Sequence, residues 1–148
     1  MSDETAAAGV ADALERLRLA EAKLARRRQA VSGLTDTDRT AMRYILEAAD
    51  AGREVTPSRL ATRMHMSPAS ATVLVDRLVE AGLVQVSPHP TDRRKKLVVP
   101  ADRDLDPDHI DPLTRRIRTL AATLPAAEAA IIAAFLEEVI GVVGATRA

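Results

Sequence analysis

The sequence predicts a mainly α-helical protein with one small β-hairpin wing: a winged helix-turn-helix fold with dimerisation helices at both ends of the chain. Three observations lead to this fold class. Two short helix patterns follow each other closely, and each begins with a hydroxyl side chain before a proline. Two strand patterns around a basic turn come directly afterwards. Apolar residues at helical spacing occupy the two ends of the chain.

The composition is that of a globular domain. The chain has 148 residues, of which 47% are hydrophobic and 28% charged, with 21 basic and 21 acidic side chains. It contains no cysteine, which excludes a disulfide, a thiol sensor and cysteine-bound zinc. Its three histidines lack ligand spacing, so we expect no metal and no cofactor. Because neither a membrane span nor a signal peptide is visible, we expect a cytoplasmic protein without a membrane partner.

The charges are segregated along the chain although they cancel in total. Residues 53–96 carry eight basic and four acidic side chains, whereas residues 97–148 carry five basic and eight acidic ones. A basic middle is typical of a segment that contacts nucleic acid. The alternative is that the two segments merely have solvated faces of different charge.

The first helix is predicted from an apolar stripe between Val10 and Val31, and Gly33 ends it. A second helix begins after Thr35, a hydroxyl cap, and ends at Gly52.

The next two helices form the helix-turn-helix unit. Thr56 with Pro57 begins the first of them, and Ser67 with Pro68 begins the second, which closes at Gly82. Because only a few residues separate the two helices, they are expected to pack as one unit.

The predicted wing follows this unit directly. Residues 83–87 and 95–99 are β-prone runs on either side of a proline-rich, basic turn. A turn that is so short and so cationic is expected to lie at the surface.

The C-terminal part is predicted to be helical and apolar. Helix starts are possible at Asp106 with Pro107 and at Asp111 with Pro112, and Pro125 begins a last helix that is apolar around most of its circumference. Such a helix cannot remain exposed. We therefore expect a homodimer in which residues 1–32 and 103–148 are the dimerisation helices and residues 33–102 are the winged-helix region.

Several short motifs occur in a characteristic order. They are Leu60-Ala61, residues 67–72, Val75-Asp76-Arg77-Leu78, Ala81-Gly82-Leu83-Val84 and, above all, Asp92-Arg93-Arg94. In this order and spacing, residues 34–99 resemble the MarR family of bacterial transcriptional regulators. The resemblance implies a homodimeric, sequence-specific DNA-binding regulator, a repressor that a small-molecule effector releases from a pseudo-palindromic operator in double-stranded DNA.

The chain departs from the family pattern at three points. Gln85 stands where members usually carry arginine, which removes one possible phosphate contact. Residues 99–102 replace the usual Leu-Thr and charged glycine turn before the fifth helix. The absence of cysteine excludes the family's thiol-based peroxide sensing.

In a winged helix, the second helix of the pair reads the major groove through its N-terminal residues. The candidates here are Ser67, Pro68, Ala69, Ser70 and Thr72. They include no asparagine, glutamine or arginine for a bidentate base contact, so direct readout should be modest. The alternative is that the two serines only cap and solvate the helix.

Four charged residues complete the predicted DNA interface. The resemblance suggests that Arg77 reaches a phosphate, with an ion pair to Asp76 or Glu80 as the alternative. Arg93 and Arg94 suit the narrow minor groove, where the family places the second arginine. We expect Asp92 to hold one of these arginines in a fork-like ion pair.

The resemblance also implies a small phenolic or anionic effector. The polar candidates for its site are Arg43, Tyr44 and His65, although structural roles for these residues are the alternative. We expect no enzyme, because the chain lacks a nucleophile triad and a glycine-rich phosphate loop. The competing function is a winged-helix protein-interaction module, or an antagonist of another regulator, without strong DNA binding.

Overall fold

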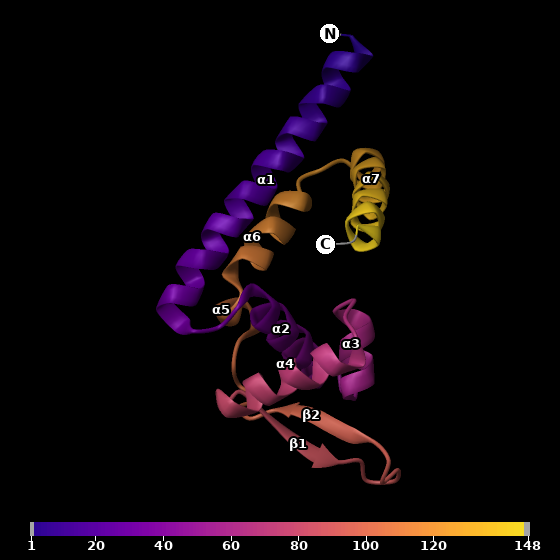
Figure 1. Cartoon of the computed structure of the whole chain (residues 1–148). Coiled ribbons are helices and arrows are strands. Elements are labelled where there is room, and N and C mark those ends of the chain that lie inside the picture. Colours follow the sequence, from indigo (N-terminus) through magenta and orange to yellow (C-terminus); the bar gives the residue numbers. More distant parts are fainter. Residues whose placement is uncertain (1, 147–148) are drawn as a thin grey trace. The chain divides into compact units, whose positions relative to one another are not determined.

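The computed structural model describes residues 2–146, which fall into two units, the first ending at Ile110 and the second beginning at Asp111. The first unit contains α1 (Asp3–Ser32), α2 (Asp36–Asp50), α3 (Pro57–Arg63), α4 (Pro68–Glu80), β1 (Val84–Pro88), β2 (Lys96–Pro100) and α5 (Pro107–Ile110). The second contains α6 (Pro112–Ala121) and α7 (Ala126–Ala145) (Figure 1). The predicted fold class, mainly helical with one hairpin, is confirmed.

The helices begin at the predicted caps. The Thr35 hydroxyl accepts a hydrogen bond from the Asp38 backbone N–H at 3.0 Å, and an Asp38 carboxylate oxygen accepts one from the Thr35 N–H at 3.0 Å. This reciprocal pair is a capping box. Thr56 and Ser67 cap α3 and α4 through their hydroxyls, each followed by proline. The three predicted starts are therefore confirmed.

Some boundaries differ from the prediction. Helix α1 begins at Asp3, ahead of the apolar stripe, because the Ser2 side chain caps it. Gly33 ends this helix in a left-handed conformation, with φ 71°. Both helix starts that the sequence allows after the hairpin occur, since α5 begins at Pro107 and α6 at Pro112.

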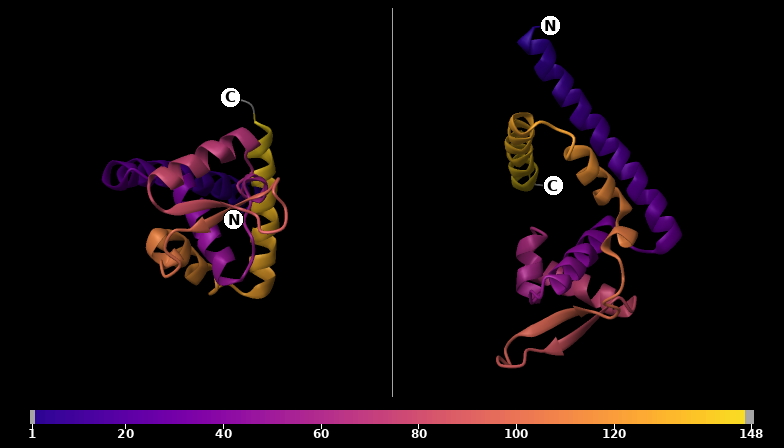
Figure 2. Two further views of the ribbon diagram at one scale, coloured as in Figure 1. Left: turned by 90° about the horizontal axis from the view of Figure 1, so that it is seen from below. Right: turned by 180° about the vertical axis from the view of Figure 1, so that it is seen from behind.

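The hairpin is antiparallel and is attached to the helices. Val84 lies opposite Pro100 and Pro88 opposite Lys96, so each strand is one residue later than predicted. The Val98 N–H donates to the Val55 carbonyl oxygen at 2.8 Å, which ties β2 to the segment before α3. The other end of the hairpin projects away from the helices of this unit (Figure 2).

The core of the first unit is formed around α2. Helices α3 and α4 and both strands contribute to it, and its buried apolar members include Ala41, Met42, Ile45, Leu46, Leu60, Leu74, Leu78, Val84 and Val98. Burial of these side chains supplies the main stabilisation of the first unit. It leaves the outer side of α4 and the hairpin turn at the surface.

The second unit exposes apolar side chains. On α7 these are Ile131, Ile132, Phe135, Leu136, Ile140, Val142 and Val143. None of the described helices has the length and hydropathy needed to cross a membrane. The division into dimerisation helices and a winged-helix region concerns assembly and stays a prediction.

Candidate nucleic-acid interface

The predicted base-reading residues lie together on the exposed first turns of α4. Ser67, Pro68, Ala69, Ser70 and Thr72 are all exposed. The Ser67 and Ser70 hydroxyl oxygens are 3.0 Å apart, and the Thr72 hydroxyl donates to the Pro68 carbonyl oxygen at 3.1 Å. Each hydroxyl oxygen keeps acceptor capacity beyond these local bonds. The structure thus brings the five residues together, and their contact with bases stays a prediction.

A hollow of about 470 Å³ lies beside these turns. Thr35 and Thr37 from the start of α2 form one side, and Ser70, Val73 and Arg77 from α4 contribute to the other. The first turn of α2 is therefore part of the same surface as the exposed side of α4.

Arg77 is attached to α2. Its Nη2 and Nε donate to one carboxylate oxygen of Asp38, at 2.8 and 3.3 Å. The Asp38 side chain is 3% exposed, whereas that of Arg77 is 47% exposed. The predicted alternative, an ion pair of Arg77 with Asp76 or Glu80, is wrong, because the partner is Asp38. A buried carboxylate requires a charged partner, whereas Asp76 and Glu80 are exposed. A phosphate contact by Arg77 stays a prediction.

The contacts of Asp38 determine its ionisation. Burial alone would raise the pKa of this carboxyl group, but hydrogen bonds from Arg77 and Thr35 outweigh burial and lower the pKa below its ordinary value. Asp38 is therefore a fixed negative charge that joins the start of α2 to α4.

The turn of the wing presents two arginines. Arg93 and Arg94 are exposed, as predicted for residues that reach DNA. Asp92 has a different role from the expected one, because its carboxylate accepts the Arg94 backbone N–H at 3.0 Å in place of a guanidinium. A short acidic side chain followed two residues later by a backbone donor favours this local turn. Asp92 thus shapes the turn and leaves both guanidinium groups at the surface.

His89 is a second organising residue of the turn, which the sequence analysis did not identify. Its Nδ1 accepts hydrogen bonds from the backbone N–H groups of Thr91 and Asp92, both at 3.2 Å. Its Nε2 lies 3.0 Å from a carboxylate oxygen of Glu54, which precedes α3. In the sequence, His89 lies between two prolines, which indicates a turn. This pattern does not reveal that Glu54 is the partner of the ring.

The predicted effector residues line none of the three hollows described for residues 2–146. Arg43 is buried, with Nη1 2.9 Å from a Glu47 oxygen and Nη2 2.7 Å from an Asp108 oxygen. The Arg63 guanidinium lies over the ring of Tyr44, 5.7 Å from its centroid. His65 is exposed in a left-handed turn, with φ 52°. Their role in binding an effector stays a prediction.

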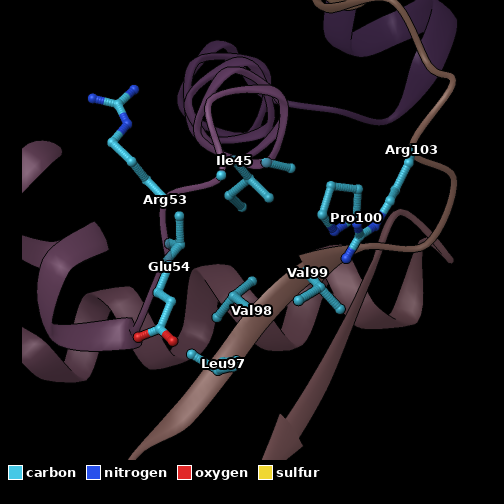
Figure 3. A pocket seen from close by; sticks show the side chains of 11 residues that line it. Ile45, Arg53, Glu54, Leu97, Val98, Val99, Pro100 and Arg103 are labelled. Carbon is cyan, nitrogen blue, oxygen red and sulfur yellow. The ribbon is translucent and has the colours of Figure 1, made fainter. Parts of the chain in front are cut away.

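A pocket of about 210 Å³ lies between α2 and β2. Its walls include Ile45 and Val98, with Arg53, Glu54 and Arg103 at its margins. Figure 3 shows the Arg53 guanidinium directed away from the Glu54 carboxylate. None of the three predicted effector residues lines this pocket.

A helix pair with an exposed second helix, followed by a basic hairpin, defines a winged helix-turn-helix protein. Residues 32–95, which contain α3, α4, β1 and the wing turn but end before β2, match the model of the MarR family. The resemblance seen in the sequence is confirmed over this segment. No curated protein matches the chain.

Solved structures with a similar fold cover most of the chain. The Staphylococcus aureus MepR–DNA complex has a TM-score of 0.63 and 16% identity, over 88% of this chain and 95% of that one. A MarR protein from Peptoclostridium difficile has a TM-score of 0.64 and 18% identity, over 91% of this chain and 86% of that one. Apo MarR from E. coli has a TM-score of 0.57 and 22% identity, over 87% of this chain and 95% of that one.

Proposed function

We propose that the chain is a homodimeric, sequence-specific DNA-binding transcriptional regulator of the cytoplasm. The observation that carries this proposal is the joint exposure of the first turns of α4 and of Arg93 and Arg94 within one unit. A helix that presents hydroxyls suits the major groove, and an arginine at a wing tip suits the adjacent minor groove. The similar fold of MepR, solved in complex with DNA, supports the same interface.

The proposed dimer rests on α7. Seven of its large apolar side chains are at least 39% exposed in the single chain, far more apolar surface than one soluble helix normally presents. A two-fold dimer buries such a face on both copies at once. It also places two recognition helices on one DNA duplex.

The proposed mode of regulation is repression relieved by a small phenolic or anionic effector. Its support is the family match over residues 32–95. The protein is proposed to have no catalytic role.

The direct test is a gel-shift assay with the promoter region next to the protein's own gene, followed by footprinting. Two-fold symmetry predicts protection of two half-sites whose centres lie about 34 to 36 Å apart. Protection of one short half-site would contradict the dimeric mode.

A protein-interaction module is the second candidate. The observations that favour it are the balanced total charge and Gln85, an exposed residue of β1 where the family usually has arginine. A folded protein that binds no duplex even at low salt would support this candidate, because phosphate contacts alone give measurable non-specific binding.

A further inference from the structure

The hairpin and the segment around the start of α3 form the two walls of one hollow, named here the α3–wing hollow. Its volume is about 440 Å³. Residues 54 and 56–59 line one side, and residues 94–96 of the wing line the other. It is separate from the hollow beside α4, with which it shares no lining residue.

The α3–wing hollow is lined by more positive than negative side chains. Arg59, Arg94, Lys95 and Lys96 line it, and Glu54 is its only acidic lining residue. Among the described residues, none of the four cations forms an ion pair with a carboxylate. Arg59 is nevertheless positioned, because its Nη1 donates to the Glu54 backbone carbonyl oxygen at 3.0 Å. Four cations gathered around a hollow with a single acidic residue create a net positive potential that attracts an anion.

His89 joins the two walls. Because its Nδ1 accepts two backbone N–H groups of the wing turn, the proton of the neutral ring must lie on Nε2. That nitrogen faces a Glu54 carboxylate oxygen at 3.0 Å, and the His89 side chain is only 13% exposed. The ring thus holds the turn that carries Arg94 against the segment that carries Arg59, and it occupies one oxygen of the only acidic group in the hollow.

We propose that the α3–wing hollow binds a backbone phosphate of duplex DNA, with Arg59 as its principal ligand, and that His89 is the positioning residue that holds its two walls together. This inference rests on the proposed function. A planar guanidinium with lysines nearby is well suited to bind a phosphate group. In protein–DNA complexes, contacts with phosphates fix the register of the protein on the duplex. Arg59 lies outside the recognition helix and the wing, so the proposal extends the interface to α3.

The first test compares Arg59→Ala with Arg53→Ala across a salt series of DNA binding. Both variants remove one exposed arginine, but Arg53 does not line the hollow. Arg59→Ala is expected to lower the slope of log affinity against log salt by about one for each bound protomer, whereas Arg53→Ala leaves the slope unchanged. Equal slopes in the two variants would overturn the phosphate site.

The second test separates the two contacts of His89. His89→Ala is expected to weaken DNA binding about tenfold, the effect of losing one well-placed contact per site. His89→Asn, whose amide oxygen can accept the two turn N–H groups, should recover part of this loss. Glu54→Gln keeps an acceptor for Nε2–H and removes the negative charge, so it should bind DNA more tightly. Wild-type affinity in folded His89→Ala would overturn the positioning role.

Two further outcomes separate this inference from the function on which it rests. A wild-type protein that binds no duplex at low salt overturns both. Unchanged DNA binding by Arg59→Ala overturns only the hollow. A site for free phosphate would instead raise the wild-type melting temperature in millimolar inorganic phosphate and lose that rise in Arg59→Ala without a change in the salt slope. That result would overturn the assignment to DNA.

Discussion

At the scale of single residues, the arginines of the proposed interface differ in how firmly they are held. Arg77 is fixed by a buried carboxylate before any DNA arrives. Arg94 is exposed at the wing turn, and within residues 2–146 its one hydrogen bond is the backbone N–H donated to Asp92. A free guanidinium at a turn can adapt to a groove, but it loses side-chain entropy when it binds. We therefore predict that Arg94 contributes to DNA binding without contributing to the stability of the fold.

The first prediction concerns Arg94. Arg94→Ala should weaken operator binding by about 1 to 3 kcal/mol per subunit, because a guanidinium in the minor groove meets a concentrated negative potential. The fold and the oligomeric state should be unchanged. Fluorescence anisotropy with labelled operator measures the change, with Arg53→Ala as the control for a lost surface charge. Wild-type affinity in Arg94→Ala would shift support to the protein-interaction module.

The second prediction concerns Asp38 and acid. Because the pKa of Asp38 is lowered in the folded protein, its stabilising contribution is complete above the unfolded value of about 4 and is lost as the pH falls through the lower folded value. Asp38→Asn should therefore be less stable than wild type by about 1 to 3 kcal/mol at pH 7, with a smaller difference below pH 4. Urea unfolding between pH 3 and 7 checks this.

The control for this experiment is Asp76→Asn on the exposed side of α4. It should stay within about 0.5 kcal/mol of wild type, as expected for a surface position. If the Asp38→Asn difference is as large at pH 3 as at pH 7, the ionised carboxylate is not the source of the stabilisation.

At the scale of elements, local signals were predictable and distant partners were not. The caps at Thr35, Thr56 and Ser67 each act on a backbone group three residues away, so the sequence alone reveals them. Arg77 and Asp38 are 39 residues apart, and His89 and Glu54 are 35 apart. No periodicity or motif links such pairs. The exposed residues of the interface were therefore predicted, whereas the contacts that position them were not.

The third prediction concerns the end of α4. Gly82 turns the chain into the wing with φ 74°, and a Cβ there would meet no atom within 4 Å. Gly82→Ala should therefore destabilise the protein by about 1 to 2 kcal/mol through backbone strain alone. Gly9→Ala in the interior of α1, which also has open space, should instead stabilise it by about 0.5 to 1 kcal/mol. Chemical denaturation measures both, and equal effects of the same sign would contradict this account.

At the scale of the whole molecule, the buried core and the proposed interface lie in the first unit, whereas the second unit has almost no core of its own. Its ten-residue and twenty-residue helices contain no buried side chain. Such helices are marginally stable alone and gain most of their stability from packing. Burial of these exposed apolar side chains would favour association with a second copy, and a dimer would supply the packing that α7 lacks.

The fourth prediction tests that dimer through Ile132 and Leu136, which lie four residues apart on one face of α7 and are 42% and 39% exposed in the single chain. Leu136→Asp should convert the dimer to monomer, because the interface would otherwise bury an unpaired charge. Glu138→Ala, which changes a charge on the same helix, should remain dimeric. Light scattering at micromolar concentration distinguishes the two, and a well-folded wild-type monomer there would contradict the dimer. Since two recognition helices read one operator only when they are joined, Leu136→Asp should also lose specific DNA binding while each winged-helix region stays folded.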